Sequence, residues 1–301
     1  MGGLAWLVGA SLGLVGVLAL LRPWPSAMRV VGLVGCALPF ALPLSTPLLR
    51  AGAALVCWLV FIKVLQYAAG HERPRGAVEF FQFAILPAVV RWDGPRRADL
   101  ARFGRTAAAG VFQVAVALLL VWLVTSLDLR SPVELVTTQL GLYFALAGFA
   151  NLAALSLSLR GLDYQDPFDN PLLSRTPSEF WGRRWNTWVN HTLYRYVFLP
   201  AGGRRRPARG IMAAFLVSGL FHDALVAAGN LRVTLWMTAF FLLQGLIVAV
   251  TSGSRGFRRL ARRSPVLTWA VTAVLMLTTG VLLVRGADGI DPSRAWERCC
   301  R

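Results

Sequence analysis

An all-α, polytopic membrane protein is the fold class that the sequence predicts. Hydrophobic residues make up 56% of the chain, the mean hydropathy is +0.58, and several apolar runs approach the roughly 20 residues that a helix needs to cross a bilayer. We expect about eight transmembrane helices, at residues 4–21, 30–49, 51–70, 106–125, 133–159, 211–228, 233–251 and 266–284. The loops between them are too short for a soluble domain, so we expect one integral-membrane domain over residues 1–301, with its motifs in residues 161–228.

A further apolar run, residues 77–90, is shorter and contains Glu79 and Pro87. A charge and a helix-breaking residue in so short a run favour a re-entrant or interfacial helix. The first run, residues 4–21, has no basic residue before it and Arg22 after it, which is the reverse of a secretory signal peptide. We therefore expect this run to remain as the first span.

The arginines are divided unevenly between the two sides of the predicted membrane. Four loops on one side hold 2, 7, 9 and 5 arginines, 23 in total, whereas the other side, with both termini, holds seven. The positive-inside rule places the basic loops in the cytoplasm and both termini outside. The same rule accounts for the net charge of +17 without a nucleic-acid partner. Thirty arginines against one lysine favour a GC-rich bacterial genome, and hence the bacterial inner membrane.

The lone lysine, Lys63, lies close enough to the end of its predicted span for its amino group to snorkel to the interface. The cysteines are Cys36, Cys57, Cys299 and Cys300. They form no CxxC motif and no His cluster accompanies them, so we expect neither a metal site nor a disulfide framework. His71 and His191 lie in basic or interfacial sequence, where we expect solvated side chains.

The loop of about 50 residues between 160 and 210 contains a helix start signal. Thr176 is a suitable N-cap, Pro177 suits the first turn, and Glu179 completes a capping box. We expect this helix to continue to about residue 199, because Pro200 and two glycines follow.

The predicted helix is amphipathic at 100° per residue. Its aromatic face carries Trp181, Trp185 and Trp188, flanked by Arg184 and Arg195, and its polar face carries Arg183, Asn186, Thr187 and Asn190. Such a helix lies in the membrane interface, with its tryptophans anchored in lipid or against the bundle and with the flanking arginines near lipid phosphates.

His222 is the residue that most strongly indicates chemistry. It is the twelfth residue of the run 211–228, which places it on the order of 16 Å from the cytoplasmic end of that helix, close to mid-bilayer. Burial disfavours the charged imidazolium, and a neutral imidazole can take a proton from a hydroxyl as a general base. The alternative is a histidine that hydrogen-bonds across helices for packing alone.

Ser218 lies one turn before His222 on the same face, and Gly219 leaves room for close approach of another chain. Asp223 points about 100° away from His222, so it is poorly placed to orient the imidazole as a triad carboxylate does. We expect Asp223 to cap a neighbouring polar group or to pair with an arginine.

Two motifs, NPLLSRTPSEFWGRRWN at residues 170–186 and VSGLFHD at residues 217–223, resemble the wax synthase branch of the membrane-bound O-acyltransferase superfamily. That branch has an FWGRRWN-type motif followed by a Ser-Gly-Leu-x-His-Glu motif on a transmembrane helix. The resemblance covers about 55 residues, and it departs from the family at Asp223, where Glu is usual. It implies a membrane-embedded enzyme that transfers an acyl group from acyl-CoA to a lipophilic alcohol, with no bound cofactor.

The resemblance also implies roles for residues. His222 is the motif histidine and acts as the base, and Asn186 is the polar residue that closes the aromatic motif. Asn186 is then placed to hydrogen-bond the thioester carbonyl or the developing oxyanion. The residues expected to bind substrate are Arg183, Arg184, Trp185, Ser218 and Asp223. For the arginines, including Arg204–Arg206, the choice lies between CoA phosphates and topogenic charge.

Two other functions remain open from the sequence. A lipid transporter would also carry His and Asp at membrane depth, but it more often shows two related halves with interrupted helices, and we find no such symmetry. An acid–base isomerase or cyclase of an isoprenoid would use His222 and Asp223 in the same kind of chamber.

Overall fold

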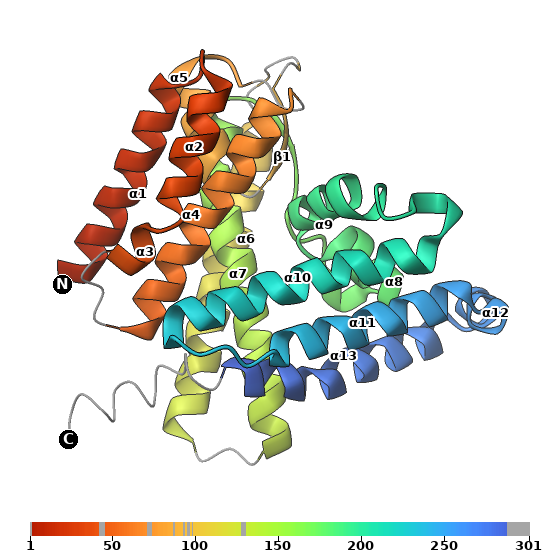
Figure 1. Ribbon diagram of the computed structural model, residues 1–301. Coiled ribbons are helices and arrows are strands. Elements are labelled where there is room, and N and C mark those ends of the chain that lie inside the picture. Colours follow the sequence, from red (N-terminus) through yellow and green to blue (C-terminus); the bar gives the residue numbers. More distant parts are fainter. Residues whose placement is uncertain are drawn as a thin grey trace.

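The computed structural model describes residues 2–41, 46–70, 74–86, 88–92, 94, 97, 99–127 and 131–287, and it is almost entirely helical (Figure 1). The N-terminal part contains α1 (Gly2–Leu20), α2 (Pro25–Gly35), α3 (Leu38–Ala41), α4 (Pro47–Ala68), α5 (Gly76–Ile85), α6 (Leu100–Ser126) and α7 (Ser131–Leu159). The C-terminal part contains α10 (Pro207–Asn230), α11 (Trp236–Gly253), α12 (Arg255–Arg263) and α13 (Pro265–Ala287). The predicted all-α class is confirmed, apart from one short antiparallel pair, β1 (Val89–Arg91) and β2 (Asp163–Gln165).

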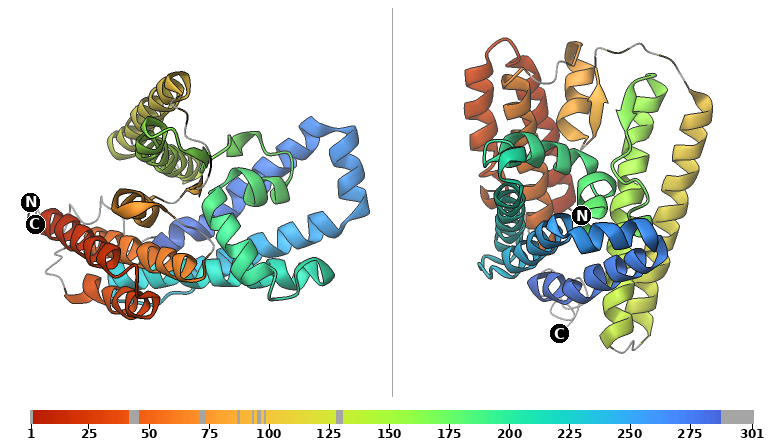
Figure 2. Two further views of the ribbon diagram at one scale, coloured as in Figure 1. Left: turned by 90° about the horizontal axis from the view of Figure 1, so that it is seen from above. Right: turned by 90° about the vertical axis from the view of Figure 1, so that its right-hand side faces the viewer.

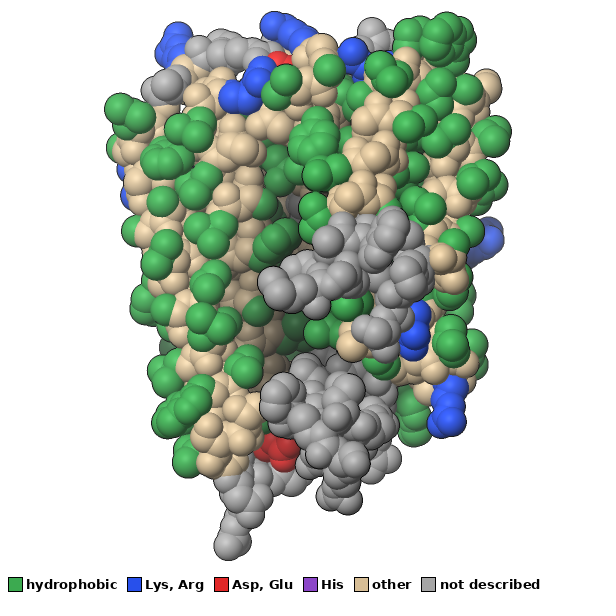
Figure 3. Space-filling view, turned by 90° about the vertical axis from the view of Figure 1, so that its left-hand side faces the viewer, with side chains coloured by type: hydrophobic (Ala, Val, Ile, Leu, Met, Phe, Trp, Pro, Cys, Tyr) green, Lys and Arg blue, Asp and Glu red, His purple; other side chains and the backbone are tan. Residues whose placement is uncertain are grey.

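In the part of the chain that the structure describes, five helices, against the eight predicted, are long and apolar enough to cross a membrane, namely α4, α6, α7, α10 and α11. Large apolar side chains also cover the outside of the bundle. On α6, for example, Val111, Phe112, Leu118 and Trp122 are each more than half exposed. The face formed by the N-terminal helices is largely hydrophobic, with Lys and Arg side chains along its upper rim (Figure 3). Since lipid is the solvent that such a surface needs, the chain is a multi-pass integral membrane protein.

The helices do not share one direction. The helices α1, α2 and α4 and the pair α6 and α7 run in roughly the same direction, whereas α10, α11 and α13 cross them at a large angle (Figures 1 and 2). The two groups meet where α10 packs against α4. Arg50, near the start of α4, donates two hydrogen bonds to the carbonyl of Gly229 at the end of α10, at 3.2 and 2.8 Å.

One predicted span needs correction, and one shorter run behaves as predicted. Residues 30–49 do not form one continuous span, because α2 ends at Gly35 and the short α3 follows after a turn. Pro39 has no N–H to bond the carbonyl of Gly35, so a helix cannot run through this point unbroken. In the run 77–90, α5 ends at Ile85 and β1 begins at Val89, so its helix is too short to cross the membrane, as the sequence predicts.

The prediction that Lys63 snorkels to the interface is wrong. Its side chain is only 2% exposed, and its Nζ lies 3.4 Å from the carbonyl oxygen of Ala88. The amino group also lies over the rings of Phe83 and Trp188, 4.7 and 4.8 Å from their centroids. Lys63 therefore faces Phe83 of α5 and Trp188 rather than lipid. Packing between these segments keeps its side chain inside the protein, although the side chain is long enough to reach the interface.

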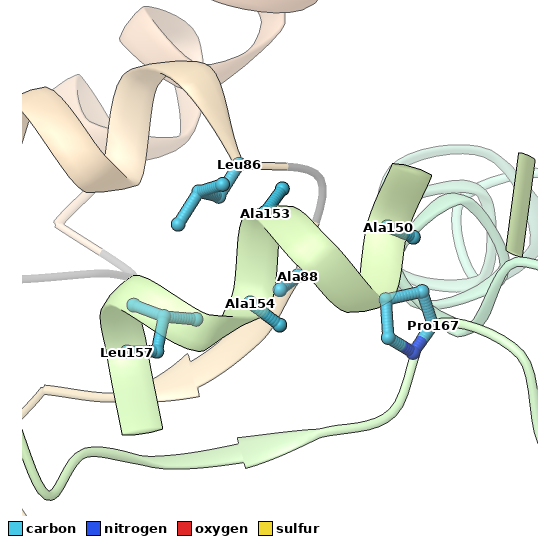
Figure 4. Close-up of a pocket in the computed structure, with 7 residues that line it drawn as sticks. All are labelled: Leu86, Ala88, Ala150, Ala153, Ala154, Leu157 and Pro167. Carbon is cyan, nitrogen blue, oxygen red and sulfur yellow. The ribbon is translucent and has the colours of Figure 1, made fainter. Parts of the chain in front are cut away.

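A small apolar pocket lies between α7 and the segment that joins α5 to β1 (Figure 4). Its lining consists of Leu86, Ala88, Ala150, Ala153, Ala154, Leu157 and Pro167. None of these side chains carries a polar or titratable group, so the pocket is not a candidate for chemistry.

Candidate active site

His222 lies in α10 and is held by its own helix. Its Nδ1 is 2.7 Å from the carbonyl oxygen of Ser218, one turn earlier. A carbonyl oxygen only accepts hydrogen bonds, so Nδ1 carries the proton and Nε2 of the neutral ring keeps a free lone pair. This tautomer is the one that a general base needs, because Nε2 can accept a proton from a hydroxyl.

Aromatic side chains pack beside the imidazole. The ring centroids of His222 and Phe241 are 4.5 Å apart, and Phe241 lies 5.8 Å from Trp181. Trp181 in turn packs edge-on against Phe215, at 5.6 Å. We call Phe215, Phe241 and Trp181 the aromatic wall. It connects the FWGRRWN motif to His222 and gives the imidazole an apolar neighbour.

A buried amide holds the aromatic wall in place. Gln244 of α11 is fully buried, and its Oε1 accepts a hydrogen bond from Trp181 Nε1 at 3.1 Å. Its Nε2 donates to Thr279 Oγ1 of α13 at 2.5 Å. Gln244 is not among the residues predicted from the sequence, although an amide in the middle of the apolar run TAFFLLQGLIVAV is a signal that could have identified it.

Asp223 is buried and caps α11. Its two carboxylate oxygens accept hydrogen bonds from the backbone N–H groups of Met237 at 3.1 Å and Thr238 at 2.7 Å. A negative charge at this position also interacts favourably with the positive, N-terminal end of the α11 dipole. Gly219 brings the same two helices together, since a Cβ added there would lie 2.6 Å from the Cα of Thr238. These contacts fix α11 against α10 and so place Phe241 beside His222.

The helix predicted from residue 177 to about 199 is broken at Asn186. The segments are α8 (Pro177–Glu179), the π-helical turn η2 (Phe180–Arg184), α9 (Thr187–Leu193) and the π-helical turn η3 (Tyr194–Phe198). Asn186 has φ +42°, in the left-handed region that Asn tolerates better than most residues. The predicted division into one aromatic and one polar face therefore does not hold across this corner.

Tertiary contacts hold the corner. Asn186 Oδ1 caps α9 by accepting from the N–H of Val189 at 3.3 Å. The neighbouring Thr187 donates its N–H to the carbonyl of Pro167 at 2.9 Å and its hydroxyl to the carbonyl of Asp166 at 3.0 Å. Because Oδ1 is used for capping, the Nδ2 group is the part of Asn186 that can serve a substrate.

The three tryptophans occupy three different environments. Trp188 is 1% exposed and packs on Lys63, so interfacial anchoring is wrong for this residue. Trp185 stacks on Phe180 at 5.4 Å and meets Phe168 edge-on at 5.2 Å. Trp181 belongs to the aromatic wall and lies 6.1 Å from Trp185.

The two arginines of the FWGRRWN motif also differ. Arg184 Nε bonds Glu179 Oε1 at 2.8 Å, and its Nη1 bonds the carbonyl of Asp169 at 3.0 Å. Arg183, in contrast, has an exposed side chain. The predicted N-cap is confirmed, because Thr176 Oγ1 accepts from the N–H of Glu179 at 3.1 Å.

Glu179 departs from the predicted capping box by one residue. Its Oε2 accepts from the N–H of Arg175 at 2.8 Å rather than from that of Thr176. Partial burial opposes ionisation of the carboxyl, but the Arg175 N–H and the Arg184 guanidinium outweigh it and hold the pKa of Glu179 below its ordinary value.

The structure thus brings Ser218, His222, Asp223 and the two tryptophans Trp181 and Trp185 into one connected cluster. Asn186 joins it through its neighbour Trp185, and its own side chain bonds within α9. His191 is exposed, while His71, Cys299 and Cys300 lie outside the described residues. Within the described part of the chain, no group of three or more His, Cys, Asp or Glu side chains is placed to hold a metal ion.

Comparison with known proteins agrees with the motifs. Residues 164–243 match the membrane bound O-acyl transferase family, which confirms the resemblance of this part of the chain to that family. The segment includes the FWGRRWN corner, His222, Asp223 and Phe241.

Several curated plant proteins are similar to the chain. It is 32% identical to probable long-chain-alcohol O-fatty-acyltransferase 2 of Arabidopsis thaliana over 141 residues, which is 44% of this chain and 41% of that protein. It is 26% identical to acyl-CoA--sterol O-acyltransferase 1 of the same plant, over 68% of this chain and 65% of that protein. It is 33% identical to the long-chain-alcohol O-fatty-acyltransferase of Simmondsia chinensis, over 37% of this chain and 33% of that protein. The matches thus span from a third to just under two thirds of these relatives.

Proposed function

We propose that this protein is a membrane-embedded O-acyltransferase, similar to wax synthases, that moves an acyl group from acyl-CoA to the hydroxyl of a lipophilic alcohol. The observation that carries the proposal is the free Nε2 of His222, fixed by the Nδ1 bond to Ser218 and placed beside the aromatic wall within the family segment. The names of the relatives favour long-chain alcohols or sterols as acceptors, and we propose terpenoid alcohols as a further class on the ground of their lipophilic hydroxyl alone. They also favour acyl transfer over isoprenoid isomerisation and over lipid transport.

In the proposed reaction, Nε2 takes the hydroxyl proton as the alcohol oxygen attacks the thioester carbonyl carbon. The C–O bond forms, the C–S bond breaks, and the proton on Nε2 passes to the leaving sulfur to give free CoA. His222 is then neutral again. Because no covalent acyl-enzyme is needed, both substrates are bound together, and holding them in register lowers the entropic part of the barrier.

Asn186 and the other predicted residues serve this step in different ways. We assign oxyanion stabilisation to Asn186 Nδ2, an interaction typically worth about 3 kcal/mol. Arg183 is exposed and suits a CoA phosphate, whereas Arg184 is bonded to Glu179 and supports the corner. Ser218 and Asp223 act on the substrate site through His222 and α11, and Trp185 supports the corner from the side of Phe168.

The activity can be tested with purified protein in lipid nanodiscs, radiolabelled acyl-CoA and a panel of lipophilic alcohols. We expect release of free CoA that depends on the alcohol and matches ester formation. Release without an alcohol would indicate a hydrolase, and an absence of CoA release with every alcohol would contradict the proposal. His191→Ala is a matched control for His222→Ala, because it removes an exposed imidazole from the same region of the chain.

We also propose the orientation that the arginines indicate, with the basic loops in the cytoplasm of a bacterial cell and both termini outside. A cysteine at position 205 should then be labelled only from the cytoplasmic side. A cysteine between residues 128 and 132, of which 128–130 lie outside the described residues, should be labelled only from outside. Labelling of both positions from one face would contradict this orientation.

A further inference from the structure

The C-terminal part of the chain is almost free of acidic residues. From Phe180 to Ala287 the sequence contains one, Asp223, against 14 arginines. Asp223 is buried and bonded to two backbone N–H groups of α11, so it is not available to surface arginines. The positive charge of this region is therefore not neutralised by carboxylates of its own segment.

Nine of these arginines have exposed side chains in two short stretches. One stretch leads into α10 and carries Arg204, Arg205, Arg206 and Arg209. The other is α12, which carries Arg255, Arg258, Arg259, Arg262 and Arg263. We call the two stretches together the arginine surface. The remaining large side chains of α12, Phe257 and Leu260, are half-buried, so this helix turns its arginines outward.

The two stretches lie at the same end of the molecule. In α11, Gly245 packs against Phe215 and Met212 of α10, as shown by the 2.9 and 3.2 Å that would separate an added Cβ from their side chains. From this level α10 runs back to Arg209 while α11 runs on to Gly253 and α12. Both stretches accordingly appear at the right-hand end of Figure 1 and again in the view from above (Figure 2).

Topology does not explain the missing carboxylates. The positive-inside rule counts Lys and Arg, and acidic residues contribute little to it. The N-terminal part of the chain shows that arginines and carboxylates can share loops, since Arg91 and Arg102 lie 3.5 and 3.8 Å from Asp163, and Arg160 lies 3.4 Å from Glu79. The absence of carboxylates from the arginine surface therefore indicates that its positive charge binds an anionic partner.

We propose that the arginine surface binds the headgroups of anionic phospholipids and holds α12 in the membrane interface. Guanidinium groups bind phosphate oxygens with two parallel hydrogen bonds. The surface also lies at one end of the apolar helices α10, α11 and α13, and basic residues next to the end of an apolar helix are suited to meet headgroups.

The number of charges favours phospholipid over the CoA of the substrate. The nucleotide of CoA carries one phosphomonoester and one diphosphate, about four negative charges, and so matches less than half of the nine arginines. The α12 stretch alone extends about 12 Å along its axis, which suits several adjacent headgroups better than one nucleotide. CoA remains a distinct outcome of the test, because it offers the same phosphate chemistry.

The test uses purified protein in phosphatidylcholine nanodiscs that contain a minor fraction of spin-labelled phosphatidylglycerol. The fraction of motionally restricted label gives the preference for the anionic lipid over a spin-labelled phosphatidylcholine. The variant is Arg255→Gln/Arg259→Gln/Arg262→Gln/Arg263→Gln, which spares Arg258 because its guanidinium donates to the carbonyl of Ser252. The matched control removes four exposed arginines elsewhere, at Arg29, Arg97, Arg105 and Arg232.

We expect the α12 variant to lose at least three quarters of the preference, and the control variant to keep most of it. The corresponding four Arg→Lys changes should retain the preference at low salt, and 0.5 M salt, about threefold above physiological ionic strength, should weaken it in the wild type. An unchanged preference in the α12 Gln variant would overturn the proposal. So would displacement of the restricted lipid by acyl-CoA, which would assign the surface to the substrate. None of these readouts requires acyl transfer, so the result does not depend on the proposed reaction.

Discussion

His222 and Asn186 are held in place by different kinds of contact. His222 is fixed by the carbonyl of Ser218, four residues away in the same helix. Asn186 is fixed at a corner whose neighbours bond to residues about 20 positions away, through Thr187 to Asp166 and Pro167, and whose next turn rests on Lys63 of α4. The comparison teaches that a base can be positioned locally, whereas a residue outside a regular helix needs the tertiary structure to place it.

The largest expected effect belongs to His222. Replacement by Ala removes Nε2 and should reduce alcohol-dependent CoA release by at least about 100-fold, the usual scale for the loss of a general base. The His191→Ala control should stay within about threefold of the wild type, because its side chain is exposed. Near-normal turnover of the His222 variant at matched expression would remove this residue from the mechanism.

Two substitutions separate the capping function of Asn186 from its proposed catalytic function. Asp at this position keeps an oxygen for the N–H of Val189 but loses the Nδ2 donor and adds a negative charge. We expect Asn186→Asp to lower kcat by about 100-fold with little change in the apparent affinity for acyl-CoA, and Asn186→Ala to lower it less.

The measurement is steady-state kinetics with acyl-CoA varied at saturating alcohol. Thermal unfolding should show the Asp variant to be nearly as stable as the wild type, because the cap remains. An Asp variant as active as the wild type would mean that Asn186 only shapes the corner.

Substitution of Asp223 tests how much the cap on α11 contributes to stability. Asp223→Ala leaves two buried N–H groups without an acceptor, which costs about 1–3 kcal/mol for each group. Asp223→Asn keeps one carbonyl oxygen and should lose roughly half as much stability. Unfolding temperatures of the three proteins in one detergent give the comparison, and an Ala variant as stable as the wild type would argue against the cap.

Gln244 and Trp181 should behave as one unit. Gln244→Leu and Trp181→Phe each remove the same hydrogen bond, so the double variant should be less impaired than the sum of the single variants by about 1 kcal/mol. The quantity to measure is kcat/KM, since the wall packs against the proposed base. Strict additivity would show that the bond does not couple the FWGRRWN motif to α11.

The smallest effect is expected at Glu179. Its folded-state pKa lies below its ordinary value of 4.5, so the ionised carboxylate contributes stability above pH 4.5 that is lost as the pH falls through the lower folded-state value. Glu179→Gln should therefore cost less than about 1 kcal/mol at pH 7, and the difference from the wild type should shrink below pH 4. A difference that is constant from pH 7 to pH 3 would exclude this carboxylate as its source.

Much of the candidate site could be predicted from local sequence. The apolar run around His222 predicts the helix that contains it. In any such helix Ser218 lies one turn before His222, with its carbonyl directed toward the later residue. Thr176 was identified as an N-cap because capping depends on residues three positions apart. The break at Asn186 could not be predicted from local sequence. Asn186 adopts a left-handed backbone conformation, and the neighbouring Thr187 bonds to the carbonyl of Pro167, which is 20 residues away.

By itself the sequence determined that this is a polytopic helical membrane protein, that its motifs lie in residues 161–228, and that His222 lies in an apolar helix. Those properties depend on composition, on periodicity and on short motifs. The tertiary structure decided that Lys63 and Trp188 are interior, that Asp223 caps α11, and that Gln244 holds Trp181 beside Phe241. Each of these depends on which helices meet, and an isolated apolar helix presents nearly the same surface to lipid as to another helix.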